Sequence, residues 1–587
     1  MKSSELQYLW AELIVEELVR NGADRIVLSP GSRNSPIVLA AAENERVRSS
    51  VHFDERGAAF YALGYAKATG KPCVLVCTSG TAAANYLPAV VEASKSCVPL
   101  IVITADRPIE LRDTSANQTI DQIGLFGKYP RWSFDIPSAD PSVAAEFVLT
   151  TIDQAIYRSL RVPEGPVHLN CQFREPLSPD NLGSVFEDIP DSIKSWFAGE
   201  EPYTRYVHNR FIADNATLEE IGSILKESER GVIFAGNLPH DLDPEPLFSF
   251  AEAAKMPVLA CISSGLRFGS HAHSEMLISN YDLCLSDEHL CRALSPDFTI
   301  HLGGPVVSKR LNEYLDNSGA TKVVINDTPF REDQSHKVDF RVEMDPGEFC
   351  RRMRGVSTDS ESALLRPYRK LQDLSGDIIS HDDLMQSFTN ELSLAKIILK
   401  MIPNDSAVFL GNSMPIRDAD MCGVTRASKL LVGVNRGASG IDGNVASAVG
   451  FAEGNERRLI LLIGDLALLH DINSLALVKE SSIPITIVVF NNHGGGIFSF
   501  LPVTKHDSHF DKFFAASHDF NFKDVSAMFG IDYFCPQTFL QFRDDFGQAV
   551  KSTKSCILEV KVDSKRNVAE HASIAQHMIE AVAAELL

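Results

Sequence analysis

The chain has 587 residues, of which 55 are basic and 77 acidic, so its formal net charge is −22 at pH 7. An acidic surface of this kind disfavours nucleic acid and anionic membranes as partners. No apolar run approaches the ~20 residues that span a bilayer, which argues against an integral membrane segment. The length suffices for about three domains, each with its own hydrophobic core.

The first 20 residues place acidic side chains among apolar positions, which predicts an amphipathic helix rather than a signal peptide. The 11 cysteines are scattered, with no C-x-x-C pair and no cluster of histidine and cysteine. This pattern is typical of reduced, mostly buried thiols in a reducing compartment. We therefore expect a cytoplasmic protein.

Short runs rich in aliphatic residues alternate with helical patterns over residues 1–182, as in a doubly wound parallel sheet. A polar, proline-containing stretch from Glu175 to about Arg205 is interpreted as a linker. The expected strands of this first domain are 26–28, 74–77, 100–104 and 166–170.

A second domain is predicted over residues 205–355, followed by a charged region, 351–377, interpreted as a second linker. The α/β alternation then resumes in a third domain, 381–587. The expected strands are 231–235, 257–261, 298–302 and 322–326 in the second domain, and 407–410, 430–434, 459–463, 485–490 and 556–562 in the third. The predicted fold class is α/β, with three doubly wound parallel-sheet domains, of which the outer two could be distant structural duplicates.

Two loops that follow expected strands of the third domain carry oxygen ligands for a metal ion: GDL (464–466) and NNHGGG (491–496). A hard divalent cation such as Mg2+ prefers near-octahedral oxygen ligands, few of them from the protein. Asp465 offers a carboxylate, Asn492 an amide oxygen and Gly494 a backbone carbonyl, which leaves positions for two phosphate oxygens and a water. The glycines allow close approach to phosphates, at the strand ends where open α/β sheets bind ligands.

The spacing of these loops, GDL followed after 24 residues by NN, resembles the signature of enzymes that use thiamin diphosphate (thiamine pyrophosphate). Most such signatures have glycine at the position of Leu466. The alternative is a pair of ordinary strand-to-helix turns, because glycine, aspartate and asparagine are common turn residues.

A segment far away in the sequence supports the cofactor interpretation. Glu55 opens a pattern of small residues typical of a helix, in a segment similar to the glutamate-bearing helix of thiamin diphosphate enzymes. In those enzymes the carboxyl group hydrogen-bonds the aminopyrimidine ring, whose imino form then takes the proton of thiazolium C2. The run 73–85, a strand, a glycine turn and a helix start, also matches their pyrimidine domain. The alternative for Glu55 is an acid favoured by the helix dipole.

Longer matches extend over both halves of the chain. They are SPGSRNSP (29–36), TADRP (104–108), NQTI (117–120), GNSMPIRD (411–418), NRGASGIDG (435–443) and NNHGGGIFSFLP (491–502). Together they resemble the 2-succinyl-5-enolpyruvyl-6-hydroxy-3-cyclohexene-1-carboxylate synthase family of menaquinone biosynthesis. The GDL form is itself usual in this family, whereas Ala467 stands where serine is expected. The likeness covers essentially the whole chain and is weakest from about 181 to 400.

This resemblance implies a thiamin diphosphate-binding fold, with pyrimidine-binding, middle and diphosphate-binding domains in that order. The implied cofactors are thiamin diphosphate and Mg2+, or Mn2+ in its place. The implied activity is that of a carboligating transferase, which decarboxylates 2-oxoglutarate, adds the succinyl semialdehyde carbanion equivalent to isochorismate and releases CO2. In the family the active sites lie at the subunit interface of a homodimer or homotetramer.

Individual roles carry over from the same resemblance. Glu55 would be the catalytic acid–base group, and Ile441 the apolar wedge between the two cofactor rings, although it could equally be a core aliphatic residue. The metal ligands would be Asp465, Asn492 and Gly494. The cofactor-binding residues would be Glu55, Ser413, Gly437, Ser439, Gly440, Ile441, Gly464, Asp465, Leu466, Asn492, Gly494, Gly496 and Ile497.

Both implied substrates are dicarboxylates, and arginine is suited to bidentate recognition of carboxylates. Because charge beyond ~8 Å is largely screened, local cations must supply the attraction in this acidic protein. By resemblance, Arg417 and Arg436 would bind the 2-oxoglutarate-derived group. Phe498 and Leu501 would form an apolar wall near the reacting atoms, and the alternative for them is plain core packing. The residues that would bind isochorismate are Arg33, Arg107, Asn117, Gln118, Lys309 and Arg310, and Ser32 would be a further substrate-binding residue. Taken alone, each arginine is more often a solvated surface charge.

Two other classes stay open. The first is another thiamin diphosphate enzyme, such as a 2-oxoacid decarboxylase or an acetolactate synthase-like carboligase, which would not require this set of arginines. The second is a non-catalytic binding protein on the same scaffold, which would have lost the acid at position 55 or a metal ligand. Neither is lost here.

Overall fold

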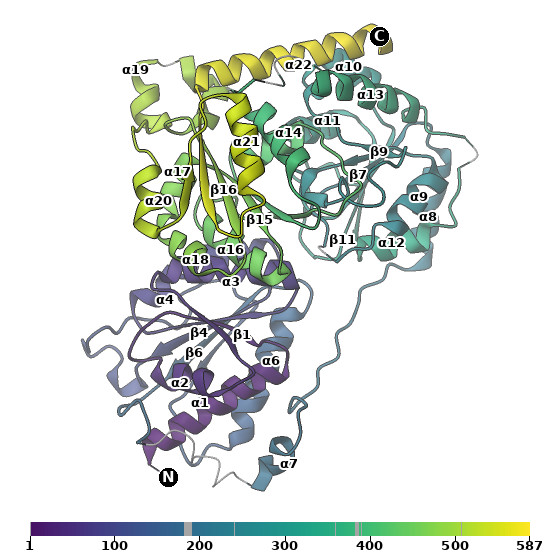
Figure 1. Ribbon diagram of the computed structural model, residues 1–587. Helices are drawn as coiled ribbons and strands as arrows, with labels where there is room; N and C mark the ends of the chain where they lie inside the picture. Colours follow the sequence, from purple (N-terminus) through teal and green to yellow (C-terminus); the bar gives the residue numbers. More distant parts are fainter. Residues whose placement is uncertain are drawn as a thin grey trace. The chain divides into compact units, whose positions relative to one another are not determined.

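The computed structural model describes residues 2–180, 191–239, 241–358, 360–381, 385, 387, 388, 390–505 and 507–587 (Figure 1). These residues divide into two compact units. Unit 1 consists of Met1–Asn209, Asn435–Glu456 and His470–Ser482. Unit 2 consists of Arg210–Val434, Arg457–Leu469 and Ile483–Leu587.

The described part of unit 1 is built on a six-stranded parallel sheet with the order β2-β1-β3-β4-β6-β5. Its strands are β1 (Arg25–Leu28), β2 (Arg48–Val51), β3 (Cys73–Cys77), β4 (Leu100–Asp106), β5 (Trp132–Ile136) and β6 (Pro166–Gln172). One face packs on α1 (Ser3–Arg20), α2 (Ser35–Glu43) and α6 (Ala145–Leu160). The other helices of this unit include α3 (Glu55–Thr69), α4 (Thr81–Asn85), α5 (Leu87–Lys95), α7 (Lys194–Phe197), α16 (Asn444–Asn455) and α18 (Leu475–Glu480).

The predicted small-residue helix is α3, and close helix packing explains its composition. Asp54 caps its first turn by accepting hydrogen bonds from the backbone N–H groups of Arg56 and Gly57. A Cβ atom at Gly64 would lie 2.0 Å from the carbonyl oxygen of Ser447 in α16. Because small residues let two backbones approach, α3 and α16 pack directly on each other.

The described part of unit 2 contains a second parallel sheet, with the order β12-β11-β10-β7-β8-β9. Its strands are β7 (Gly231–Ala235), β8 (Val258–Ala260), β9 (Leu277–Ile278), β10 (Phe298–Leu302), β11 (Thr321–Asn326) and β12 (Phe340–Glu343). The helices of this segment are α8 (Asn215–Glu227), α9 (Glu245–Ala254), α10 (Glu288–Ala293), α11 (Lys309–Asn317), α12 (Pro346–Met353) and α13 (Leu365–His381).

A third parallel sheet, also in unit 2, has the order β14-β13-β15-β16-β18-β17, the same order as the first sheet. Its strands are β13 (Ala407–Leu410), β14 (Leu431–Val434), β15 (Leu459–Gly464), β16 (Ile485–Asn491), β17 (Asp532–Phe534) and β18 (Cys556–Lys561). The accompanying helices include α14 (Glu391–Met401), α15 (Met414–Met421), α17 (Asp465–His470), α19 (Asp507–Phe510), α20 (Lys523–Phe529), α21 (Phe539–Ala549) and α22 (Ser564–Leu586). The shared strand order agrees with the expectation that the outer domains are structural duplicates.

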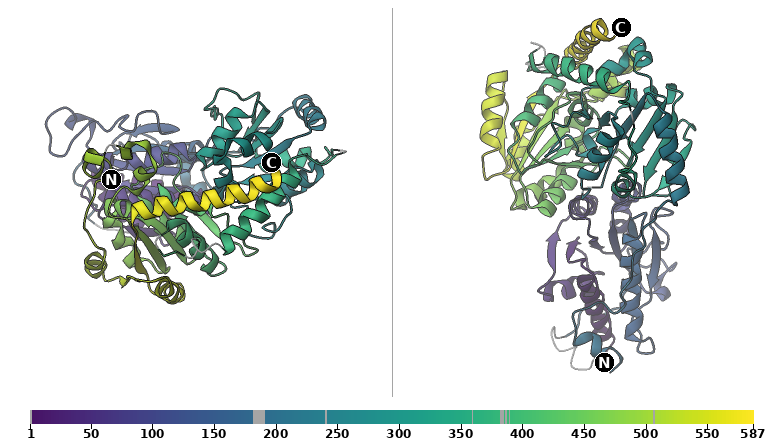
Figure 2. Two further views of the ribbon diagram at one scale, coloured as in Figure 1. Left: turned by 90° about the horizontal axis from the view of Figure 1, so that it is seen from above. Right: turned by 90° about the vertical axis from the view of Figure 1, so that its right-hand side faces the viewer.

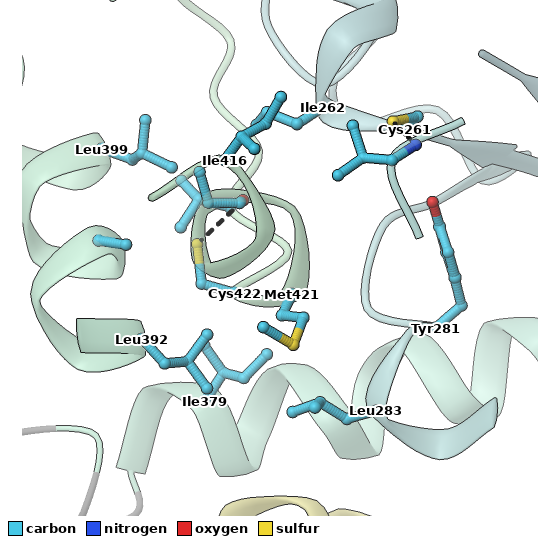
Figure 3. Close-up of a cluster of buried hydrophobic side chains, with 14 of the residues drawn as sticks. Cys261, Ile262, Tyr281, Leu283, Ile379, Leu392, Leu399, Ile416, Met421 and Cys422 are labelled. Atoms are coloured by element: carbon cyan, nitrogen blue, oxygen red, sulfur yellow. Dashed lines mark hydrogen bonds between the residues drawn. The ribbon is translucent and has the colours of Figure 1, made fainter. Parts of the chain in front are cut away.

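Helix α15 lies in a continuous apolar core to which residues of both sheets of unit 2 contribute. Figure 3 shows Ile416 and Met421 of α15 among side chains from α13, α14 and the loops after β8 and β9. The long helix α22, yellow in Figure 2, contacts α10, α13 and the 3-10 turn Gly496–Phe500. The two sheets of unit 2 are therefore held together by shared helices rather than by a linker.

A fully buried ion pair reinforces this junction. Arg267, whose exposed fraction is 0%, donates to the carboxylate and to the backbone carbonyl of Asp420 in α15, both at 2.7 Å. It also donates to the carbonyl of Ala260 in β8 at 2.8 Å. The carboxylate of Asp420 accepts a further hydrogen bond from the backbone of Ile262.

The α/β class and the three parallel sheets are confirmed, and each predicted strand is present within one or two residues. The prediction of a second linker over 351–377 is wrong, because Leu365–His381 is a helix that buries Tyr368, Leu371 and Ile379. In the first predicted linker, residues 181–190 lie outside the described residues, and Trp196 packs in the core of unit 1. No helix in the described ranges combines the length and apolar character needed to cross a bilayer.

Arg267→Met tests the buried ion pair. Removing one partner leaves the Asp420 carboxylate buried without compensation, so we expect the free energy of unfolding to fall by about 3–5 kcal/mol. Denaturant titration followed by circular dichroism measures the change. Arg352→Met, which removes an exposed ion pair with Glu348 in α12, should change it by at most about 1 kcal/mol. Equal effects of the two substitutions would contradict a structural role for the buried pair.

Candidate active site

The predicted substrate residues of unit 1 lie at the carboxyl ends of neighbouring strands. All strands of this sheet are parallel, but in the order β2-β1-β3-β4 the connections leave β1 on one side toward β2 and then continue from β3 on the other, so the strand order reverses between β1 and β3. Open α/β sheets bind ligands at such a position. Arg33 follows β1 and is 6% exposed. Its guanidinium donates to the carbonyl of Phe173 and to the Glu175 carboxylate, each at 3.0 Å. Its Nε atom is buried and has no partner among the described residues.

Arg107 follows β4 and is 8% exposed. It donates to Ser79 Oγ and, at 3.0 Å, to the carbonyl of Gln118. Gln118 itself donates to the carbonyl of Ser79 at 2.8 Å, and both Gln118 and the neighbouring Asn117 are exposed residues. Burial and the nearby positive charge of Arg33 lower the pKa of Arg107. The structure thus places Arg33, Arg107 and Gln118 near the carboxyl end of β3, which lies between β1 and β4. Ser32 is exposed on the loop after β1.

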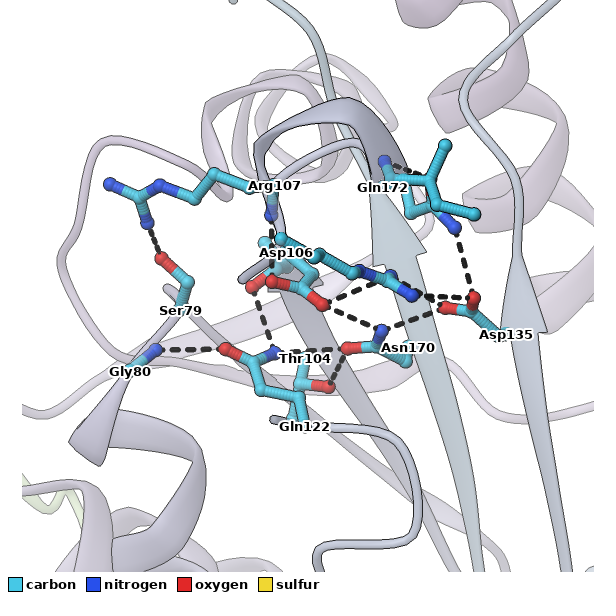
Figure 4. Close-up of polar contacts among 12 residues, drawn as sticks. Ser79, Gly80, Thr104, Asp106, Arg107, Gln122, Asp135, Asn170 and Gln172 are labelled. Carbon is cyan, nitrogen blue, oxygen red and sulfur yellow. Dashed lines mark hydrogen bonds and ion pairs between the residues drawn. The ribbon is translucent and has the colours of Figure 1, made fainter. Parts of the chain in front are cut away.

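A polar network below Arg107 fixes its position (Figure 4). The backbone N–H of Arg107 donates to the carboxylate of Asp106 at 2.7 Å. That buried carboxylate also pairs with Arg112 at 3.1 Å and accepts from Asn170 at 2.9 Å. Gln122 links Asn170 to the backbone N–H of Gly80. These side chains hold the strand ends and the loop that carries Gln118 together.

The loop 435–441 of unit 1 is anchored by a buried glutamate that sequence reasoning missed. Glu92 in α5 accepts hydrogen bonds from the backbone N–H groups of Gly437 (2.9 Å) and Ala438 (2.6 Å). Lys67 reaches the Glu92 carboxylate at 3.3 Å and the side chain of Asn435 at 2.7 Å. Although burial opposes the charge, Lys67 and these N–H donors lower the pKa of Glu92.

Other predicted cofactor residues of unit 1 lie on the same loop or near it. Ile441 is 41% exposed, so it is not a core aliphatic residue in the structure, and its contact with the cofactor stays a prediction. Arg436 and Gly440 are half-buried and Ser439 is exposed. Glu55 is the first residue of α3, is half-buried, and accepts a hydrogen bond from Asn85 at 3.2 Å.

In unit 2 the structure brings the predicted metal ligands together at the ends of β15 and β16. Asp465 is 1% exposed and accepts hydrogen bonds from the backbone N–H groups of Leu466 (2.6 Å) and Gly494 (2.9 Å). His518 Nε2 lies 3.3 Å from the same carboxylate. Burial raises the pKa of Asp465. A cation bound here would compensate the desolvated carboxylate.

Asn492 and the glycines complete this group. The amide oxygen of Asn492 is buried and has no hydrogen-bond donor among the described residues. Gly494 adopts φ +151°, and a Cβ atom there would lie 2.4 Å from the carbonyl of Ala515. A Cβ atom at Gly496 would lie 2.3 Å from Nδ2 of Asn492, whereas Gly464 has open space around it. A carboxylate, an unpaired amide oxygen and a backbone carbonyl fit a hard divalent cation.

The remaining predicted residues of unit 2 lie in three regions: the start of α15, the turn after β16, and the start of α11. Ser413 begins α15 with φ +73°, and its carbonyl accepts a hydrogen bond from Arg417. Ile497 and Phe498 are half-buried, while Leu501 is 46% exposed. Lys309 is an exposed partner of Glu313, and Arg310 pairs with Asp282 at 2.5 Å. The roles of Lys309 and Arg310 stay predictions.

Comparison with known proteins adds to this geometry. The family described as "Thiamine pyrophosphate enzyme, N-terminal TPP binding domain" matches residues 10–125. "Middle domain of thiamine pyrophosphate" matches 187–410, and "Thiamine pyrophosphate enzyme, C-terminal TPP binding domain" matches 419–560. All three parts therefore correspond to thiamine pyrophosphate enzymes.

Two curated relatives carry the name 2-succinyl-5-enolpyruvyl-6-hydroxy-3-cyclohexene-1-carboxylate synthase. The protein of Rubrobacter xylanophilus is 43% identical, over 96% of this chain and 97% of the relative. That of Chlorobium phaeobacteroides is 42% identical, over 97% of each. The chain belongs to this synthase family. The resemblance stated from the sequence motifs is thereby confirmed, and with it the dependence on thiamin diphosphate that the domain matches indicate.

Solved structures agree on the fold of this synthase family member. The thiamine diphosphate-dependent 4-hydroxybenzoylformate decarboxylase of Rhodococcus jostii RHA1 has a TM-score of 0.72 and 17% identity, over 94% of this chain and 99% of that one. The benzoylformate decarboxylase of Polynucleobacter necessarius also has a TM-score of 0.72, with 14% identity over 94% and 98%. At this identity the likeness supports the fold alone.

Gly496→Ala tests the geometry of the candidate metal site. The added methyl group would collide with the Asn492 amide, so we expect weaker Mg2+ binding by roughly 10- to 100-fold, the usual effect of disturbing a ligand's support. Calorimetric titration of Mg2+ in the presence of thiamin diphosphate measures this. Gly355→Ala, where a Cβ atom would meet nothing within 4 Å, is the control. Unchanged affinity in Gly496→Ala would argue that Asn492 is not a ligand.

Proposed function

We propose that this chain is a 2-succinyl-5-enolpyruvyl-6-hydroxy-3-cyclohexene-1-carboxylate synthase of menaquinone biosynthesis. It decarboxylates 2-oxoglutarate and joins the resulting four-carbon unit to isochorismate, with Mg2+ or Mn2+ and thiamin diphosphate as cofactors. The observation that carries the proposal is the likeness to relatives of that name, at 42–43% identity over nearly the whole chain. The three-domain division at 1–182, 205–355 and 381–587 belongs to the same proposal.

Thiamin diphosphate, when bound, supplies the nucleophilic carbon and the cationic ring that accepts electrons as CO2 leaves. The chain's own residues position it and the substrates. Asp465, Asn492 and Gly494 would hold the divalent cation that accompanies the diphosphate group. The half-buried Glu55 would hydrogen-bond the pyrimidine ring and act as the acid–base group, and the exposed Ile441 would contact the cofactor.

The cations of unit 1 suit a dicarboxylate acceptor. Arg33 and Arg107 are both more than nine-tenths buried, and burial together with the positive charge of Arg33 lowers the pKa of Arg107. A bound carboxylate would compensate these two positive charges and accept a hydrogen bond from the Nε atom of Arg33. We therefore assign isochorismate to Arg33, Arg107 and Gln118. The family resemblance alone adds Asn117, Lys309 and Arg310 as isochorismate-binding residues and Ser32 as a substrate-binding residue.

The donor is assigned to other residues. Arg417 and Arg436 would bind the carboxylates of the 2-oxoglutarate-derived group, and Phe498 with Leu501 would form an apolar wall beside it. The remaining cofactor contacts are proposed for Ser413, Gly437, Ser439, Gly440, Gly464, Leu466, Gly496 and Ile497. We propose a cytoplasmic homodimer or homotetramer with its active sites at the subunit interface. Eleven free cysteines are consistent with a reducing compartment.

Product identification tests the proposal directly. The protein is incubated with 2-oxoglutarate, isochorismate, thiamin diphosphate and Mg2+, and the products are identified by mass spectrometry. We expect CO2 and one adduct that contains the isochorismate carbon skeleton. Reactions with pyruvate in place of 2-oxoglutarate separate this activity from that of an acetolactate synthase. Turnover of pyruvate, without any product from isochorismate, would contradict the proposed function.

Arg107→Ala tests the division of the substrates. Loss of one charged hydrogen-bonding partner costs about 1.5–3 kcal/mol, or roughly 10- to 100-fold in affinity. The KM for isochorismate should rise by this factor, while the KM for 2-oxoglutarate stays nearly unchanged. Steady-state kinetics with each substrate varied in turn give both values, and Arg158→Ala, an exposed arginine of α6, is the control. An equal rise in both KM values would place Arg107 at the donor or cofactor.

A further inference from the structure

Asn492 is held by a glutamate that lies 101 residues earlier in the sequence. Its side-chain Nδ2 donates a hydrogen bond to Glu391 Oε1 at 3.0 Å. Glu391 is the first residue of α14 and is 1% exposed. On the other side of the amide, Oδ1 is buried and lacks a hydrogen-bond donor among the described residues. The amide group thus has one satisfied and one unsatisfied end.

This asymmetry decides which way the amide points. A side-chain amide can rotate by half a turn, which exchanges its oxygen and its NH2 group. A divalent cation requires the oxygen, because the NH2 group would present positive charge to it. Glu391 Oε1 is an acceptor for Nδ2 when the carboxyl group is ionised, and also when a proton lies on the other oxygen, Oε2. With Oε1 in that role, the opposite orientation would place the acceptor Oδ1 against another acceptor and lose this hydrogen bond.

Glu391 is itself fixed by neighbouring elements. Its backbone N–H donates to the side-chain oxygen of Asn567 in α22 at 2.9 Å. One turn further along α22, His571 Nε2 lies 2.9 Å from the carboxylate of Asp418 in α15, which is close enough to Glu391 to influence its ionisation. The N-terminus of α14 therefore sits in a buried polar group formed by α15, α22 and the loop after β16, with little freedom to move.

We propose that Glu391 is a positioning residue, which fixes the orientation of the Asn492 amide so that its oxygen faces the metal ion. It does not touch the cation and takes no part in the reaction. This inference rests on the metal site of the proposed function. Outer partners of metal ligands typically contribute 10- to 100-fold to metal affinity, because they remove the wrong orientations of the ligand.

Two substitutions of opposite chemistry test the role. Glu391→Leu keeps similar bulk but removes the acceptor, so Mg2+ affinity should fall by roughly 10- to 100-fold. Glu391→Gln can still turn its oxygen toward Asn492 and should bind Mg2+ almost as tightly as the parent. The measurement is calorimetric titration of Mg2+ into full-length protein with saturating thiamin diphosphate. Melting temperatures without metal show that each variant is folded.

A third variant covers the case in which Glu391→Leu does not fold. Glu391→Asp keeps the carboxyl group but withdraws it from Asn492 by one methylene, so an intermediate loss of Mg2+ affinity is expected. Glu570→Leu is the matched control, because Glu570 is only 7% exposed and bonds Arg566 of its own helix. Its Mg2+ affinity should equal that of the parent.

The outcomes separate this inference from the proposed function. Parent-like Mg2+ affinity in the folded Leu or Asp variant would overturn the role of Glu391 and leave the metal site intact. A loss in Glu391→Gln as large as in Glu391→Leu would also overturn it, because an acceptor oxygen would then not suffice. Parent protein that binds no Mg2+ with thiamin diphosphate would refute the metal site itself, and the inference with it.

Discussion

The arrangement of the candidate site depends on carboxylates that are buried and then satisfied by backbone N–H groups. Burying an ionised carboxyl group is costly unless hydrogen bonds replace its water. Glu92 receives them from Gly437 and Ala438, and Asp465 from Leu466 and Gly494. Gly437, Ala438 and Gly494 belong to loops that are expected to contact the cofactor, and Leu466 lies in the first turn of α17. If such a loop moved away, a buried carboxylate would lose its hydrogen-bond donors, and this cost favours the observed loop conformation.

Burial also bears on the proposed binding of dicarboxylates by a protein with a net charge of −22. Long-range repulsion is largely screened by salt, so the local surroundings decide. Arg33 and Arg107 are buried at one strand end, where low exposure strengthens their attraction for a carboxylate. The network of Asp106, Arg112 and Asn170 sets the position of Arg107, while its guanidinium donates to Ser79 and to the Gln118 carbonyl.

Strand order supplies the framework for both halves of the site. The first and third sheets share one order, and in each the loops after the central strands carry the residues assigned to substrate, cofactor or metal. The middle sheet has another order, with the reversal between β7 and β10. There Gly236 and Gly304 crowd each other, since a Cβ atom at Gly236 would lie 1.9 Å from the Gly304 carbonyl oxygen. This packing leaves no room for a side chain at Gly236.

The sequence by itself determined the central strands, the small-residue helix α3, the loops proposed to bind the metal ion, and the family, because each is recorded in contiguous runs of residues. The strands it missed, β2, β5, β9, β12 and β17, all lie at sheet edges, where short and partly exposed segments lack a continuous apolar run. Only the tertiary structure revealed Glu92 and Glu391, which are separated from Gly437 and Asn492 by 345 and 101 residues. A buried glutamate has no local pattern of its own, because its partners are chosen by packing between helices and loops that are distant in the chain.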